Sequence, residues 1–350
     1  MNAGNQRAVR LSTLGALGIA LLLAVSVLAG CSSASAGGTT AASGGSLTTV
    51  TMVLTFPEGW ESPIFYGLEK GVFKKDGINL QVSTPSGAEA STDINYISQG
   101  QFDAGYVGTY DIPIYQQKFG DNLVNVFGWA QQNPICWIVK KSAGITQPQQ
   151  LAGKTLAIAK GSATSLIDAY FAHYGVPASK VNLETVAGSA LPSLFLSGKA
   201  AAVAGYSFEE GPEFTAQNVP VSQLCLSQAG QQYEASGIAV SKSYLTSHKQ
   251  TVANLVNALV TSFNDAKANP LAAAKAMTAK FGSQVSSAQV DMQETLALFQ
   301  LMRTPSDNGQ PYGWMSPQDM NQTISYDQKY YGLKPGYKGS FYTDEFFPKS

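Results

Sequence analysis

The sequence predicts an α/β fold of two lobes, in which two mostly parallel sheets are flanked by helices and a ligand cleft lies between the lobes. From residue 47 onward, short apolar strands alternate with helical segments, a pattern typical of parallel sheets. A helix end, a glycine, a strand and a glycine-aromatic tip follow one another at 95–108, and this plan recurs at 193–206. Two such tips indicate a cleft, because open α/β sheets bind ligands at the carboxyl ends of their strands.

Residues 1–30 have the features of a secretory signal. Arg7 and Arg10 precede an apolar run at 14–28, which is shorter than the roughly 20 residues of a bilayer-spanning helix. The Leu-Ala-Gly-Cys sequence at 28–31 resembles the lipobox of bacterial lipoproteins, which predicts cleavage before Cys31 and acylation of that cysteine. Residues 31–46, nearly all Ser, Ala, Gly and Thr after the cysteine, are expected to form a flexible tether.

Composition limits the kinds of partner. Without the two leader arginines, 20 basic and 23 acidic residues give the mature chain a formal net charge of about −3, which argues against a nucleic-acid partner. Cys136 and Cys225 are the only cysteines after Cys31. In an oxidising compartment they are expected to form one disulfide or to remain two buried thiols, and the sequence leaves both open.

Ten apolar segments are predicted to be strands: Thr49–Leu54, Ile78–Ser83, Phe102–Val107, Val124–Gly128, Cys136–Val139, Thr155–Ala159, Val181–Val186, Ala200–Gly205, Val219–Leu224 and Gly237–Val240. Ser62 is expected to cap a helix that starts with Pro63 and closes at Gly71. Ser162 is expected to cap another helix, which Gly175 ends. Further helices are predicted at 243–269, 271–280, 288–303 and 317–331.

Four segments carry a resemblance to a known family. Residues 54–58 read Leu-Thr-Phe-Pro-Glu, and 66–78 read Tyr-Gly-Leu-Glu-Lys-Gly-Val-Phe-Lys-Lys-Asp-Gly-Ile. Residues 100–105 read Gly-Gln-Phe-Asp-Ala-Gly, and 151–157 read Leu-Ala-Gly-Lys-Thr-Leu-Ala. The chain thereby resembles the nitrate/sulfonate/taurine/pyrimidine group of periplasmic binding proteins, which includes thiamine-precursor-like members. It departs from the group at Ala201, where an aspartate of structural role is common.

The resemblance implies a type II periplasmic-binding-protein fold that closes on its ligand. The order of elements in the family, together with the repeated strand-tip plan, predicts one lobe from 47–132 plus 235–350 and another from 133–234. The chain would cross between the lobes twice, near Gln132 and Glu234.

Two segments of the first lobe are expected to reach the cleft. In the loop after the first strand, Trp60 is expected either to stack on a flat ligand or only to cover the lobe surface, and Glu58 to accept hydrogen bonds from ring amines. At the first tip, Tyr106 and Thr109 are candidate ligand contacts. Thr109 suits a helix N-cap equally well.

Two segments of the second lobe complete the expected site. Ser162 and Thr164 start a helix whose free N–H groups could bind ligand oxygens, although simple capping by Ser162 is an equal alternative. At the second tip, Tyr206 offers an aromatic wall. Glu209 or Glu210 offers a carboxylate there, and we expect only one of the two to face the cleft.

These loops contain several carboxylates and aromatics but a single cation, Lys160. This balance favours a planar, amine-bearing heterocycle such as a thiamine-precursor pyrimidine, or a flavin, over an alkanesulfonate, taurine or nitrate. We expect a monomeric lipoprotein at the extracytoplasmic face of the cell membrane that passes its small-molecule ligand to ABC permease and ATPase subunits. No motif indicates catalysis, a metal or a cofactor. An enzyme or a ligand sensor on the same fold is the alternative.

Overall fold

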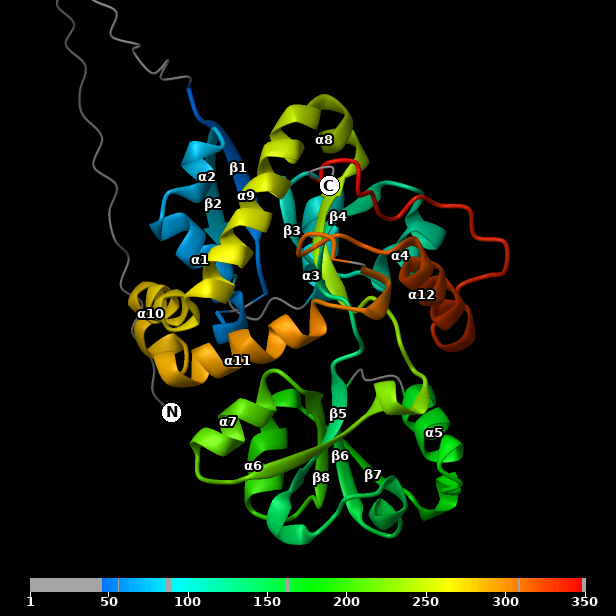
Figure 1. The fold of residues 1–350 in the computed structure, drawn as a ribbon. Coiled ribbons are helices and arrows are strands. Elements are labelled where there is room, and N and C mark those ends of the chain that lie inside the picture. Colours follow the sequence, from blue (N-terminus) through cyan, green and yellow to red (C-terminus); the bar gives the residue numbers. More distant parts are fainter. Residues whose placement is uncertain (1–45, 56, 86–89, 161–163, 308, 348–350) are drawn as a thin grey trace, which may run out of the picture. The chain divides into compact units, whose positions relative to one another are not determined.

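Two five-stranded sheets organise the chain (Figure 1). The computed structural model describes residues 46–55, 57–85, 90–160, 164–307 and 309–347. The predicted signal and Cys31 lie outside the described residues, as does the tether apart from its last residue. Residues 45–350 form one compact unit, which carries both sheets. Among the described residues, no helix is both long and apolar enough to span a membrane.

The first sheet has the strand order β2-β1-β3-β10-β4. Its strands are β1 (Thr48–Val53), β2 (Ile78–Ser83), β3 (Ala104–Gly108), β4 (Leu123–Ala130) and β10 (Ser236–Ser241). The second sheet has the order β7-β6-β8-β5-β9. Its strands are β5 (Ile135–Lys140), β6 (Thr155–Ala159), β7 (Asn182–Val186), β8 (Ala202–Tyr206) and β9 (Val221–Cys225). All ten predicted strands are present.

Each sheet is mixed, with four strands in one direction and one strand in the opposite direction, so most strands of each sheet are parallel as predicted. In the first sheet, β10 runs antiparallel to both β3 and β4. In the second sheet, β5 runs antiparallel to both β8 and β9. The reason is the path of the chain: β5 and β10 are the strands that arrive directly from the other sheet, and each enters opposite to its neighbours. The chain passes between the sheets at 131–134 and at 226–235. The predicted residue bounds of the two lobes stay a prediction.

Helices flank both sheets (Figure 1). Those placed in the sequence before β5 or after β10 are α1 (Ser62–Glu69), α2 (Val72–Lys75), α3 (Ala90–Ser98), α4 (Asp111–Phe119), α8 (Lys242–Ser247), α9 (Lys249–Ala268), α10 (Pro270–Phe281), α11 (Ala288–Leu301) and α12 (Pro317–Tyr330). Those between β5 and β9 are α5 (Thr164–His173), α6 (Leu191–Leu196) and α7 (Glu210–Ala216). The predicted helix at 243–269 is divided at His248 into α8 and α9.

One predicted helix cap is wrong. Ser62 is the first residue of α1 rather than its cap, and Glu61 holds the cap position. The Ser62 hydroxyl instead donates to the carbonyl of Gly59, because a short 3-10 helix, η1 (Gly59–Glu61), leads directly into α1. Gly71 has a φ of 69°, a left-handed conformation that glycine adopts without steric cost, so it ends α1 as expected.

Cys136 and Cys225 form a disulfide, which decides between the two alternatives for these cysteines. They lie directly opposite each other on the antiparallel strands β5 and β9. The bond therefore links β9, at the edge of the second sheet, to the strand that enters from the first sheet.

Candidate functional site

A cavity of about 620 Å³ lies at the carboxyl ends of strands from both sheets. Its lining includes Thr55 after β1, Gly108 at the end of β3, Ala159 at the end of β6 and Tyr206 at the end of β8. Both glycine-aromatic tips found in the sequence therefore contribute to it. This agrees with the rule that open α/β sheets bind ligands beyond the carboxyl ends of their strands.

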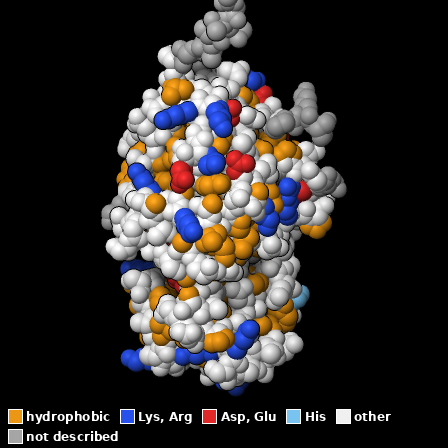
Figure 2. All heavy atoms as spheres, turned by 60° about the vertical axis from the view of Figure 1, so that its left-hand side comes forward, with side chains coloured by type: hydrophobic (Ala, Val, Ile, Leu, Met, Phe, Trp, Pro, Cys, Tyr) orange, Lys and Arg blue, Asp and Glu red, His pale blue; other side chains and the backbone are white. Residues whose placement is uncertain are grey.

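A second cavity, of about 650 Å³, lies between α7 and α11. Figure 2, in which the left-hand side of Figure 1 comes forward, shows the molecule narrowed between its upper and lower parts. The described residues that line it are small, aliphatic or neutral polar, with the glutamines Gln223, Gln289, Gln293 and Gln300. A site with neither aromatic nor charged side chains offers little to orient a small ligand. The first cavity, called the aromatic pocket below, is therefore the candidate site.

Six aromatic side chains line the aromatic pocket: Trp60, Tyr106, Tyr110, Tyr206, Phe208 and Tyr233. The Trp60 ring is only 3% exposed, because it packs against Tyr106 and Phe208 with ring centroids 5.2 and 5.6 Å away. Tyr206 is 43% exposed and stacks on Phe208 at 5.5 Å with an interplanar angle of 21°. Much of the Tyr206 side chain is therefore exposed, whereas Trp60 mainly forms part of the pocket wall.

Glu209 and Glu210 both line the pocket, which corrects the expectation that only one of them would. That expectation used the alternation of strand residues, but the two glutamates lie where the chain turns into α7. The Glu210 carboxylate accepts a hydrogen bond from the Tyr206 backbone N–H at 2.6 Å. Burial raises the pKa of Glu210 to about 7, and burial with the neighbouring carboxylates raises the pKa of Glu209 well above its usual value.

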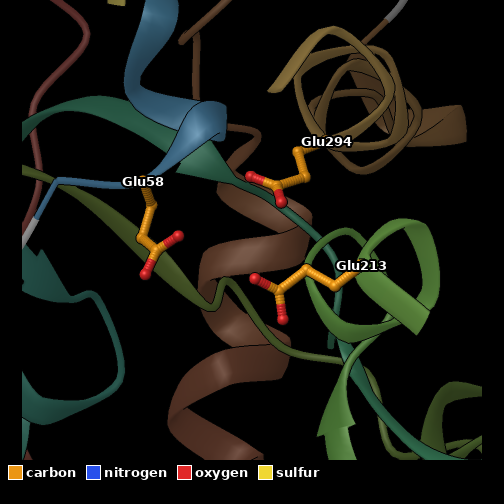
Figure 3. Close-up of side chains that lie close together, drawn as sticks. All are labelled: Glu58, Glu213 and Glu294. Carbon is orange, nitrogen blue, oxygen red and sulfur yellow. The ribbon is translucent and has the colours of Figure 1, made fainter. Parts of the chain in front are cut away.

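A further group of carboxyls lies beside the pocket: Glu58, Glu213 and Glu294 (Figure 3). One oxygen of each lies within 4.8 Å of one oxygen of each other residue. Glu213 also lines the aromatic pocket, whereas Glu58 and Glu294 do not. Burial, and to a smaller extent repulsion from Glu209, raises the pKa of Glu58 to about 9. Burial, and to a smaller extent repulsion from Glu58, raises the pKa of Glu294 to about 10.

No basic side chain neutralises these carboxyls in the part of the chain that the structure describes. The ion pairs there are Lys242–Asp121 and Lys249–Glu345, both away from the pocket. No lysine or arginine is among the described lining residues. Lys160, the cation predicted for the site, is exposed and outside the lining. The pocket is therefore suited to a ligand that carries positive charge or hydrogen-bond donors.

Two further predicted residues, Thr109 and Thr164, are absent from the described pocket lining. Thr109 is fully buried, and its hydroxyl accepts from the Asn125 amide at 2.8 Å. It is not a helix cap, because α4 begins at Asp111 with Tyr110 as its cap residue. Thr164 is exposed at the first residue of α5. Ser162 lies outside the described residues. The ligand contacts proposed for these residues stay predictions.

Sequence reasoning missed Tyr233, Glu213 and Glu294. Glu213 follows Glu210 at helical spacing, so the start of α7 carried a signal for it. Nothing in the sequence marked Glu294, because it lies in α11, more than 200 residues from Glu58. Tyr233 lies in the second passage between the sheets, where the sequence predicted no site.

Comparisons with known proteins agree with this architecture. A family model described as "NMT1/THI5 like" matches residues 61–273. No curated protein matches the chain.

Three solved structures illustrate the likeness. The periplasmic aliphatic sulphonate binding protein SsuA from Escherichia coli is 12% identical, with 86% of this chain and 94% of that chain covered and a TM-score of 0.66. The alkanesulfonate-binding protein SsuA from Xanthomonas axonopodis pv. citri, bound to MOPS, is 15% identical, with 85% and 100% covered and a TM-score of 0.61. The ligand-binding component of an ABC-type import system from Staphylococcus aureus, with zinc bound, is 12% identical, with 85% and 97% covered and a TM-score of 0.60. At these identities the likeness concerns the fold, and it confirms the expected two-lobed α/β periplasmic-binding-protein architecture.

Proposed function

Because the chain belongs to the NMT1/THI5-like family, we propose that it is an extracytoplasmic solute-binding protein that delivers a small molecule to an ABC importer. Its partners are the permease and ATPase subunits of that importer, and the chain acts as a monomer. Acylation of Cys31 anchors it to the outer face of the cell membrane through the tether. Solved structures with the same fold include sulfonate-binding proteins and a ligand-binding component of an import system, which supports the assignment to transport.

The favoured ligand is a planar heterocycle that bears an amino group or a positive charge, such as a thiamine-precursor pyrimidine. One observation carries this proposal: the pocket lining combines six aromatic rings and three carboxyls with no basic residue among the described positions. The face of Tyr206 stacks on the ring of the ligand. Glu209 and Glu210 accept hydrogen bonds from its amino group. Burial raises the pKa of both carboxyls, and a positively charged ligand favours their ionised form, in which such bonds are about twice as strong as neutral ones.

An alkanesulfonate is the second candidate, because two of the structural neighbours bind sulfonates. A sulfonate needs several donors around its oxygens, and arginine is the usual residue for that task. The described lining instead places Glu209, Glu210 and Glu213 at the pocket. These groups offer an anion no positive charge and repel it when they are ionised, so the heterocycle is favoured.

Calorimetry with the purified full chain tests the proposal. An aminopyrimidine, a flavin, taurine and nitrate are each titrated into the wild-type chain and into Glu209→Gln. Aminopyrimidine should bind, and the variant should weaken it, because glutamine keeps the shape but removes the charge. Glu184→Gln, at an exposed position of β7, is the matched control and should bind like the wild type. Binding of taurine or nitrate with aminopyrimidine inert would overturn the heterocycle assignment while leaving the binding-protein assignment intact.

A further inference from the structure

Three elements that are distant in the sequence bring carboxyl groups to one point beside the aromatic pocket. Glu58 lies in the loop before η1, Glu213 lies in α7, and Glu294 lies in α11. Figure 3 shows the three carboxyl groups directed into a shared space, and their nearest oxygens all lie within 4.8 Å of one another. Two of these elements belong with the first sheet in chain order, while α7 follows β8 of the second sheet.

The surroundings of Glu294 indicate that this carboxyl cluster requires a positively charged binding partner. Its side chain is fully buried, and within the described residues neither carboxylate oxygen has a hydrogen-bond partner. A buried carboxylate without a partner is costly, so groups of this kind are normally paired or coordinate a metal. Gly59 permits the approach, because a Cβ there would lie 2.5 Å from a Glu294 oxygen. The packing therefore brings Glu294 up to the loop that carries Glu58.

The type of ligand atom and the closeness of the three oxygens indicate which class of cation the cluster suits. Calcium binds oxygens at about 2.3–2.6 Å, so two of its ligands can lie up to roughly 5 Å apart. Magnesium binds at about 2.0–2.1 Å and holds opposite ligands no more than roughly 4.2 Å apart. One calcium ion can be bound by three oxygens that all lie within 4.8 Å of one another, whereas magnesium usually keeps several waters instead of binding to an all-protein cage. Three carboxylates without histidine or cysteine are typical of a hard cation rather than zinc.

We propose that Glu58, Glu213 and Glu294 bind one calcium ion, which joins α7 to the η1 loop and α11 at the side of the aromatic pocket. The site shares Glu213 with the lining of the aromatic pocket, but it uses none of the proposed heterocycle contacts, which are Tyr206, Glu209 and Glu210. The ion supplies the positive charge that neutralises these carboxylates, because no basic side chain among the described residues does so. Because its ligands come from elements associated with both sheets, calcium binding holds those elements together and stabilises the folded chain by mass action.

Calorimetry with the full chain, stripped of metal by a chelator, tests the proposal. Calcium chloride should bind with one ion per chain, and magnesium chloride should bind more weakly. Glu294→Gln and Glu213→Gln should each weaken calcium binding by roughly 10–100-fold or more, since even residues that only orient a ligand contribute that much. Glu184→Gln is the control and should bind calcium like the wild type.

Thermal unfolding of the same proteins gives a second readout. Calcium should raise the melting temperature of the wild type and of Glu184→Gln, but not of Glu213→Gln, whose partly exposed position makes it the variant safest for folding. Wild-type chain that binds no calcium at millimolar concentration, or variants that bind it as tightly as the wild type, would overturn the proposal. The heterocycle titrations are independent of this result, so failure here leaves the proposed function standing.

Discussion

Replacing Trp60 with alanine should destabilise the folded chain more than it weakens ligand binding. The indole is 3% exposed and packs edge-on against Trp129 and Phe208, with ring centroids 5.6 Å away in both cases. Phe208 follows β8 of the second sheet, whereas Trp60 follows β1 of the first, so this contact joins elements of both sheets. A buried tryptophan removes about 200 Å² from water, which at about 25 cal/mol per Å² amounts to roughly 5 kcal/mol.

We therefore expect Trp60→Ala to lower the free energy of unfolding by about 3–5 kcal/mol, the range for large aromatic residues in cores. Urea unfolding followed by circular dichroism measures this loss without relying on tryptophan fluorescence. Tyr206→Ala is the matched comparison, because Tyr206 lines the same pocket but is 43% exposed. It should change stability little and weaken heterocycle binding by about 1–3 kcal/mol, the cost measured for losing a base–aromatic stack.

Two results would refute this reasoning. If the free energy of unfolding of Trp60→Ala is within about 1 kcal/mol of the wild-type value, the indole does not hold the elements of the two sheets together. If Tyr206→Ala leaves calorimetric affinity unchanged while Trp60→Ala abolishes it without loss of stability, Trp60 rather than Tyr206 is the stacking platform.

Three further predictions concern pH and anchoring. Burial raises the pKa of Glu210 to about 7, so binding of a permanently cationic N-methylated aminopyrimidine should strengthen as the pH rises through 7, and Glu210→Gln should remove this dependence in calorimetry. Burial raises the pKa of the fully buried Asp327 to about 9, so the folded state holds a proton that the unfolded state releases above about pH 4. The free energy of unfolding should therefore fall between about pH 4 and 7 by up to about 4 kcal/mol more in the wild type than in Asp327→Asn. Denaturant titrations that give both proteins the same dependence on pH would contradict this. Cys31→Ala should release the chain from membranes or leave its leader uncleaved, which fractionation and intact mass would show, and a mature N-terminus other than Cys31 would rule out lipidation there.

The sequence was sufficient to predict where the strands lie along the chain and which strand ends form the pocket. Strands such as Ile78–Ser83 and Thr155–Ala159 were predicted to the residue, because local patterns specify a strand: the first alternates apolar and polar residues, and the second is a short apolar run. The two glycine-aromatic tips predicted a cleft, and Tyr106 and Tyr206 do line the aromatic pocket. Local patterns were enough to identify the tips, and the carboxyl-end rule was enough to predict that both tips meet a ligand cleft.

The tertiary structure alone decided which side chains meet. The opposite directions of β5 and β10 follow from the chain entering each sheet from the other, which no local pattern encodes. Thr109 is removed from the pocket by its hydrogen bond to Asn125 of β4. Glu58 and Glu294 meet although they lie more than 200 residues apart, because α11 packs against η1 at Gly59. Sequence periodicity specifies which face of an element is buried, whereas the contacts among buried faces arise only when distant elements pack together.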